Sequence, residues 1–600
     1  MVRRTEAVLG CLLALSANAA PLTAQREAAV HAVSLRTVSP VTVRIAPNLA
    51  HVPSLGIMEA VSSGAGDQWL TTLWQAAFVA TQATNSTLLD FEFTLRVGGP
   101  IDGPSAGLLT ASTLAALIRG KKVLPHTTIT GSINPDGGAG PVGGILQRFR
   151  GAASGGIKRF GLPLGGRHQV DEAGEVTDLF IEGKKLGVEV QELGSLDDAF
   201  LFLTGDALPR PDPLTEAEME LWPAELTALA KLTAEVRGDF QAELPQLEKE
   251  LAGVDPKSPN DSRELIERSA RQADDFAKNG DTVRAMVVWS SALVTLRVAT
   301  QDARLVGWLD ARDIGEVFAA IMRQEDALPL ERKALRSRIR GQFPNTTRAN
   351  DIYAMDILES DVTQGVAQRA GTIVKELRVL TSNGAVTEQN YPAFKRLARQ
   401  YCEDMLRVRE ELKNGQRFLA LYASLPPLKK SIAPIDAGRL APWYVSAGVA
   451  ARAALKVRLS TQSESSFEKD ATYLDLLGYG DLLAVETDPR ARLVLAARLM
   501  IYSGYLVNTY DSLGARLDAK GALTIPNSRA LSAQLDLSRL RVLQSCGQAK
   551  RETGSIPFPA RMRFLNARAA REGSDRQKAD TLADLWISNW WCEFAVRDKK

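Results

Sequence analysis

The sequence predicts an α/β domain followed by a larger region built only of helices. From Val30 to about Asp206, stretches rich in β-branched residues alternate with stretches of helical apolar spacing, as in α/β domains. From Thr215 onward, helix-forming composition and heptad-like apolar spacing predict a helical bundle or an α-solenoid. Between them, Leu208–Leu214 carries three alternating prolines, which suit neither a helix interior nor a central strand. We expect a stiff, extended and exposed linker there.

Length and charge agree with this division. A chain of 600 residues is longer than one hydrophobic core usually organises, and 45% hydrophobic residues are enough for sizeable cores. Lys and Arg number 72 against 70 for Asp and Glu, so the net charge is only +2, without the basic excess of a nucleic-acid binder. The predicted division is a signal segment at 1–19, the α/β domain at 28–206, the linker at 207–214 and the helical region at 215–600.

Within the α/β domain, apolar spacing assigns each element in turn. Helices are predicted where apolar residues recur every three or four positions, and strands where β-branched residues gather between turn residues. In chain order, the expected elements are strands at 30–38 and 41–45, a helix at 68–81, a strand at 90–97, a helix at 105–119, a strand at 127–130, a helix at 144–153, strands at 158–162 and 188–193, and a helix at 196–203.

Two segments of the helical region have a recognisable pattern. Residues 265–295 carry Ala273, Ala285 and Trp289 at positions typical of a tetratricopeptide hairpin, although an ordinary helical hairpin explains them as well. Near the carboxyl terminus, Trp586, Trp590 and Phe594 recur every fourth residue, which predicts a helix with a core-facing aromatic stripe. We expect no membrane span after the signal segment, because the apolar stretch 493–507 is short and contains a charge.

Residues 1–19 indicate an export signal. Arg3 and Arg4 precede the short apolar core Ala7–Leu15, and Ala17-Asn-Ala19 has the small residues of a cleavage site. We therefore expect a mature protein that begins near Ala20 and is periplasmic or secreted. The cysteines left after cleavage, at 402, 546 and 592, are compatible with one disulfide in an oxidising compartment, and their pairing stays open.

The segment with the clearest chemical pattern is Asp102-Gly-Pro-Ser-Ala-Gly107. Ser105 stands where a Gly/Pro turn meets the start of a helix, so its hydroxyl is exposed beside the first free backbone N–H groups. Those N–H groups are able to hold a developing oxyanion, which suits a nucleophile. A helix-capping serine is the alternative interpretation.

Further motifs, in the right order, identify a family. The sequence from Val30 to Asp206 resembles the proteolytic domain of Lon protease, the serine–lysine peptidase family. The nucleophile motif is followed by Thr130-Gly131, by the Gly-Gly turn within Gly140–Ile145, and by Gly155-Gly-Ile-Lys158. The resemblance implies a Lon-type fold with Ser105 as nucleophile and Thr130 as an orienting hydroxyl. It also implies that Asp102, Gly103 and Ala106 lie around substrate and oxyanion.

The sequence departs from the family at the general base. The resemblance places the dyad lysine at position 148, where this chain has Arg148. A buried lysine is able to lose its proton and act as a base, whereas a guanidinium stays charged. Lys121, Lys122 and Lys158 are not obvious substitutes, and His126 is the first histidine to test.

No cofactor is expected. The chain contains no G-x-x-x-x-G-K-[ST] loop for ATP, and no two of its four histidines, His31, His51, His126 and His168, stand at metal-ligand spacing. Any activity would therefore be independent of ATP.

Two functions remain open at this point. One is an exported, ATP-independent Lon-like peptidase acting on unfolded polypeptide or peptides. The other is a pseudopeptidase that has kept the fold as a peptide-binding or assembly scaffold, with Arg148 pairing with Asp102 or with a carboxylate of a bound peptide. In both, the helical region is expected to bind a protein partner, and a homo-oligomer is possible. A third possibility makes the helical region the functional part and the α/β domain its platform.

Overall fold

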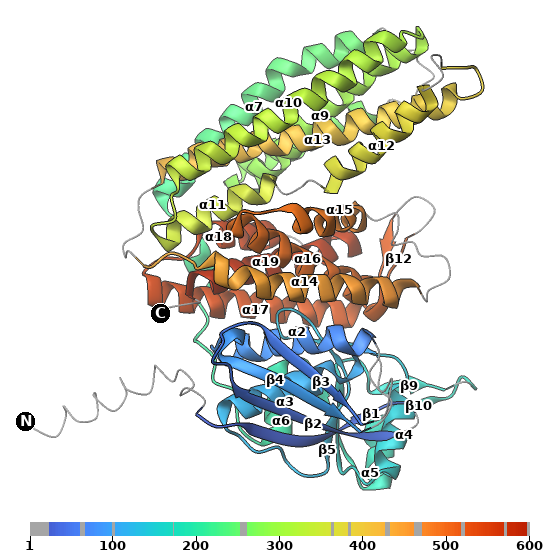
Figure 1. Ribbon diagram of the computed structural model, residues 1–600, viewed down its shortest axis with the longest axis vertical. Coiled ribbons are helices and arrows are strands. Elements are labelled where there is room, and N and C mark those ends of the chain that lie inside the picture. Colours follow the sequence, from blue (N-terminus) through green and yellow to red (C-terminus); the bar gives the residue numbers. More distant parts are fainter. Residues whose placement is uncertain are drawn as a thin grey trace, which may run out of the picture.

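The computed structural model places an α/β domain beneath two tiers of helices (Figure 1). The signal segment and Asp102 lie outside the part of the chain that it describes. The structure describes residues 23–35, 37–60, 67–98, 103–171, 173–252, 261–361, 365–381, 386–425, 432–460, 471–517, 522–568 and 573–596.

The α/β domain begins with a four-stranded sheet of order β1-β2-β4-β3. Strands β1, β2 and β4 are antiparallel neighbours, and β3 runs parallel to β4. Helix α2 connects this parallel pair, because a parallel connection needs a crossover. The elements are β1 (Arg26–Val33), β2 (Val38–Pro47), β3 (Ser54–Glu59), α2 (Asp67–Ala83), the short helix η1 (Leu88–Asp90) and β4 (Phe91–Val97).

A three-stranded parallel sheet of order β11-β8-β5 completes the domain, with helices between its strands. Its elements are η2 (Pro104–Ala106), α3 (Gly107–Arg119), β5 (Thr127–Ile129), α4 (Ile145–Ser154), β8 (Arg159–Pro163), α5 (Leu179–Leu186), β11 (Glu189–Leu193) and α6 (Leu196–Thr204). Two small hairpins join them: β6 (Ser132–Ile133) with β7 (Ala139–Gly140), and β9 (His168–Val170) with β10 (Val176–Asp178).

The first predicted strand, 30–38, is wrong in its bounds. The chain turns after Val33, and the Ser34 N–H donates to the Thr37 carbonyl at 2.9 Å. Strand β2 then begins at Val38. Ser and Thr side chains stabilise turns by local hydrogen bonds, and the Ser34 and Thr37 hydroxyls lie 2.8 Å apart. The β-branched run therefore spans the end of one strand and the start of the next.

The helical region consists of a tier of long helices and a tier that lies against the α/β domain. The apolar stretch 493–507 lies mostly in the buried helix α16. The aromatic stripe predicted for the last helix is confirmed, with Trp586, Trp590 and Phe594 at most 3% exposed. The elements are η3 (Glu216–Met219), α7 (Pro223–Leu251), α8 (Asp261–Lys278), α9 (Thr282–Asp310), α10 (Ile314–Gln342), α11 (Arg348–Asp361), α12 (Gly365–Thr381), α13 (Tyr391–Ser424), α14 (Ala437–Ser460), α15 (Ala471–Val485), α16 (Pro489–Leu506), the π-helical turn η5 (Val507–Ser512), β12 (Arg516–Leu517), β13 (Leu523–Thr524), α17 (Ser528–Thr553), α18 (Phe558–Ala567) and α19 (Asp575–Val596).

Helices α8 and α9 form a hairpin over the tetratricopeptide-like pattern. Ala273, Ala285 and Trp289 are buried in it, as either interpretation requires. However, α8 is 18 residues long and α9 is 29, which together exceed the 34 residues of one repeat. The geometry is that of a long-helix bundle.

Helix α9 is also, among the described residues, the one helix long and apolar enough to cross a membrane by length and composition. Here it packs against α7, α8 and α13. Arg297, in its middle, forms ion pairs with Glu243 of α7 and Glu410 of α13. The pair of Arg297 and Glu410 therefore lies inside the bundle, with side chains 15% and 3% exposed.

The two regions share one continuous core. On α2, Phe78 stacks on Trp443 of α14 with ring centroids 4.9 Å apart. Beside this contact, the buried Ser538 hydroxyl of α17 donates to the Asp136 carboxylate and accepts the indole N–H of Trp586 at 3.2 Å. Figure 1 shows α2 on the face of the α/β domain that is turned toward α14 and α17.

The proline-rich linker is extended, and the expectation that it is exposed holds only in part, since Pro209, Asp212 and Pro213 are exposed and the rest is covered. Leu208 is 6% exposed, and the Leu214 N–H donates to the Leu543 carbonyl of α17 at 3.1 Å. Arg210 pairs with Asp197 at 2.6 Å, and Asp197 also meets Arg541 at 2.8 Å. The segment is a packed strap between α6 and α17, because its flanking residues have partners on both.

Candidate functional site

Ser105 lies in η2, directly before α3, in the turn that the sequence indicates. Gly103 precedes it with φ 89°, a conformation that favours glycine. Gly107 begins α3 where an added Cβ would lie 2.8 Å from the Thr72 methyl group of α2. The two glycines are thus explained by backbone conformation and by close packing, and Ser105 between them is 7% exposed.

Backbone hydrogen bonds hold this turn to the end of β5. The Gly131 N–H donates to the Ser105 carbonyl at 2.8 Å, and the Leu108 N–H donates to the Gly131 carbonyl at 3.0 Å. The Thr130 hydroxyl donates to the same Ser105 carbonyl at 3.4 Å. Thr130 is therefore next to Ser105, as the sequence implies, but its hydroxyl contacts the Ser105 backbone carbonyl and not the Ser105 hydroxyl.

The Ser105 hydroxyl has no hydrogen-bond partner among the described residues. Ala106, the next position of the motif, is 6% exposed at the start of α3. The turn thus presents a serine beside a helix N-terminus, where partial positive charge favours an anion. Within the described part of the chain, no hydrogen-bonded base of the kind that activates a serine nucleophile contacts this hydroxyl.

Arg148 does not meet Ser105. Its Nε donates to the Gly143 carbonyl at 3.1 Å, and another of its N–H groups donates to the Val33 carbonyl at 2.5 Å. Burial lowers the pKa of this guanidinium, although arginine remains protonated in proteins. The side chain therefore fastens α4 to the end of β1, and the suggested pairing with Asp102 lies outside the described residues.

The remaining lysines considered from the sequence are also remote. Lys121 follows α3 at the end opposite Ser105, and a helix of 13 residues is about 20 Å long. Lys158 precedes β8 beside His126, where its N–H donates to the His126 carbonyl at 2.9 Å. Both lie at helix or strand ends that face away from the Ser105 turn.

His126, the first histidine to test as a base for Ser105, is also too far from the Ser105 turn. It precedes β5, whereas Thr130 follows β5, so about 13 Å of strand separates the two. His51 contacts the Leu89 carbonyl at 3.2 Å, and His168 lies 3.6 Å from Asp178. His31 is exposed on β1. No group of three or more metal-ligating side chains is present in the described ranges.

The structure also reveals what covers one side of the turn. A crevice of 40 Å³ lies between Pro104, Asn134 and the helical residues Gly504 and Asn508. That volume holds about one water molecule. Sequence reasoning missed this cover, because the helical residues that form it follow the motif by about 400 positions and carry no pattern of their own.

Comparison with known proteins finds one family over part of the α/β domain. Residues 96–182 match the Lon protease (S16) C-terminal proteolytic domain. This segment is a Lon-type proteolytic domain. It contains Ser105, Thr130 and Arg148, and the all-helical region lies outside the match.

Individual relatives match only this part of the chain. Lon protease of Koribacter versatilis is 31% identical over 122 residues, 20% of this chain and 14% of that protein. Lon protease of Acinetobacter baumannii is 32% identical over 116 residues, 19% and 13% of the two chains. Lon protease of Methanosarcina barkeri is 40% identical over 76 residues, 13% and 10%. The chain thus spans about one seventh or less of the length of these relatives.

Proposed function

We propose that this chain is an exported pseudopeptidase, in which the Lon-type domain serves as a peptide-binding or assembly scaffold for the helical region. One observation carries the proposal. Arg148 stands at the position of the family's lysine base, and its guanidinium donates to the Val33 and Gly143 carbonyls. No base among the described residues is hydrogen-bonded to the Ser105 hydroxyl. A serine without a proton acceptor is a poor nucleophile near neutral pH.

Export is supported by the signal-like segment 1–19 and by a disulfide between Cys546 and Cys592, whose Cα atoms lie 5.1 Å apart. Disulfides persist in oxidising compartments. Intact-mass analysis of exported protein should therefore find a chain beginning near Ala20. Residues 1–19 still attached to protein in a membrane fraction would contradict export.

The proposed scaffold acts without ATP, since no phosphate-binding loop is present in the sequence. Its partners are an unfolded polypeptide or peptide at the Lon-type domain and a protein at the helical region. We also propose that the chain forms a homo-oligomer. The proposed function involves neither nucleic acid nor a membrane-spanning segment.

Serine-directed labelling tests the absence of catalysis. The purified full chain should not turn over casein, and a fluorophosphonate should not label Ser105. Arg148→Lys places an amine at the proposed base position, and Arg148→Met is the matched control that removes the charge without supplying an amine. Labelling of Arg148→Lys but not of Arg148→Met would show that only the base is missing.

A second candidate is an active, ATP-independent peptidase, and the intact Ser105 turn favours it. Gly103, Gly107 and the contact with Thr130 all persist around this serine. Casein cleavage by the unmodified chain, abolished in Ser105→Ala and unaffected by ATP, would establish this candidate and overturn the scaffold.

A further inference from the structure

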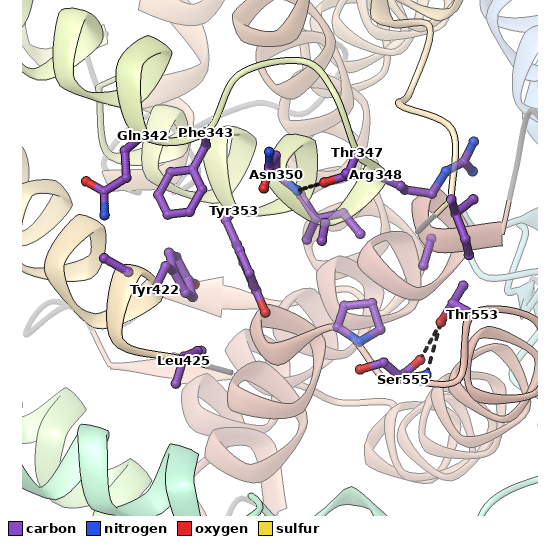
Figure 2. A pocket seen from close by; sticks show the side chains of 16 residues that line it. Gln342, Phe343, Thr347, Arg348, Asn350, Tyr353, Tyr422, Leu425, Thr553 and Ser555 are labelled. Carbon is purple, nitrogen blue, oxygen red and sulfur yellow. Dashed lines mark hydrogen bonds between the residues drawn. The ribbon is translucent and has the colours of Figure 1, made fainter. Parts of the chain in front are cut away.

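A second potential site lies in the helical region, far from the Ser105 motif in sequence. Between the start of α11, the end of α13, the α17–α18 connection and the end of α19 is a cavity of 510 Å³ (Figure 2). Cavities that bind small molecules usually measure about 300 to 1,000 Å³. We refer to it below as the aromatic cavity.

One wall of the aromatic cavity is a set of fixed rings. Tyr353 and Tyr422 stack with centroids 4.4 Å apart and planes 12° apart, and Phe343 meets Tyr353 edge-on at 5.9 Å. The Tyr422 hydroxyl donates to the Asp356 carboxylate, which holds its ring in place. A preformed aromatic wall of this kind suits a flat, largely apolar molecule.

The opposite wall contains a buried hydroxyl without a partner. Ser555 is 3% exposed, and its Oγ has no hydrogen-bond partner among the residues that the structure describes. Its backbone N–H and carbonyl are both bonded to the Thr553 hydroxyl, at 3.2 and 2.8 Å. In Figure 2 the Ser555 hydroxyl is turned away from Thr553, toward the side on which Tyr353 lies. An unsatisfied buried hydroxyl is costly, so a ligand that bonds to it gains affinity.

Charge narrows the class of ligand. Among the described residues that line the cavity, none has a carboxylate, and Arg348 is the charged side chain. Its guanidinium donates to the Ala433 and Phe594 carbonyls, each at 3.2 Å. A cation has no counter-charge here, and the arginine's donors are engaged by the backbone. The lining therefore favours a neutral molecule.

The cavity is open to solvent at one end. Gln342 and Ala423 are exposed, whereas Phe343, Ile352 and Pro557 are buried. Among the described lining residues, Gln342 and Ala423 therefore mark the end of the cavity that faces solvent.

We propose that the aromatic cavity is a binding site for a small, neutral molecule with a flat apolar body and one hydroxyl or carbonyl group. The rings of Phe343, Tyr353 and Tyr422 contact the body, and the Ser555 hydroxyl bonds to the polar group. This site is independent of the proposed function, because none of its residues belongs to the Lon-type domain.

Titration calorimetry of the full chain with 2-naphthol tests the proposal, since this probe has two fused rings and one hydroxyl. We expect saturable binding at one site, and weaker binding of naphthalene, which has no hydroxyl. Ser555→Ala should weaken 2-naphthol binding by about threefold to tenfold, the range of one hydrogen bond, and leave naphthalene binding unchanged. Because the Ser555 hydroxyl has no partner in the unliganded protein, this variant should fold with an undiminished melting temperature.

A blocking variant locates the site. Ala423→Trp places a large side chain at the exposed mouth and should abolish binding of both probes. The matched control is Val485→Trp, at a position on α15 that is 72% exposed and outside the cavity lining, and it should bind normally. Absence of saturable 2-naphthol binding, or binding that persists in both Ser555→Ala and Ala423→Trp at unchanged affinity, would overturn the proposal.

Discussion

The Ser105 turn and the aromatic cavity are opposite kinds of site. The Ser105 turn has a family motif, its serine carbonyl accepts hydrogen bonds from the Gly131 N–H and the Thr130 hydroxyl, and the crevice beside it measures only 40 Å³. The aromatic cavity has no motif, yet it measures 510 Å³ and contains an unpartnered hydroxyl. A motif preserves a backbone conformation, whereas space for a ligand depends on how distant helices pack.

Both sites depend on the last helix. Helix α19 contributes Ala595 to the aromatic cavity, and its Trp586 donates to Ser538, which bonds to Asp136 of the α/β domain. Changes to α19 therefore test whether the two sites share one folded unit.

Deleting residues 581–600 should have the largest effect. The deletion removes Trp586, Trp590 and Phe594, and each buried aromatic contributes about 3 to 5 kcal/mol. Together they are comparable with the whole stability of a typical domain, about 5 to 15 kcal/mol. We expect loss of the near-ultraviolet circular dichroism of the helical region and aggregation. An unchanged thermal midpoint would contradict a shared core.

Breaking the disulfide should have the next largest effect. Cys546 of α17 and Cys592 of α19 are 46 residues apart, and closing a loop of that length stabilises a protein by about 4 kcal/mol. Cys592→Ala should lower the free energy of unfolding in urea by about this amount. Cys402→Ala is the control, because Cys402 is also buried but unbonded, and it should cost about 1 kcal/mol. Equal losses in the two variants would mean that the bridge contributes nothing.

Asp351 should make the helical region pH-dependent. It is fully buried in α11, and burial raises its pKa to about 6, against the opposing hydrogen bond from the Ile435 N–H. Between about pH 4 and 6 the folded chain keeps a proton that the unfolded chain releases, so stability from this group falls as pH rises through that window.

The change amounts to about 2 to 3 kcal/mol, since one pKa unit corresponds to about 1.4 kcal/mol. Asp351→Asn should remove this part of the pH dependence. Urea unfolding of both proteins at pH 4 and pH 7 measures it. Parallel pH profiles for the two proteins would rule out the raised pKa.

The smallest effect is expected at the Ser105 turn. Thr130→Val removes a hydroxyl whose hydrogen bond to the Ser105 carbonyl is long, at 3.4 Å, so the loss should be below about 1 kcal/mol. The Gly131 N–H still holds the same carbonyl. A loss of several kcal/mol in thermal unfolding would show that Thr130 supports the turn more strongly than its distance indicates.

Local sequence by itself determined much of this protein. Alternating strand and helix patterns predicted the α/β domain, the glycines around Ser105 specified its turn, and the aromatic stripe of α19 marked a core face. These features depend on backbone preference and on periodic burial within a few turns of chain, so they are readable from neighbouring residues.

Only the tertiary structure decided which distant residues bond to Arg148 and Ser538. Arg148 bonds to Val33, 115 residues earlier, and Ser538 bonds to Asp136, 402 residues earlier. The proline-rich linker was predicted to be exposed because its composition does not reveal that α17 packs on it. The aromatic cavity likewise forms where helix ends from four parts of the chain meet. Such contacts arise from the packing of whole elements, and no local pattern of residues encodes them.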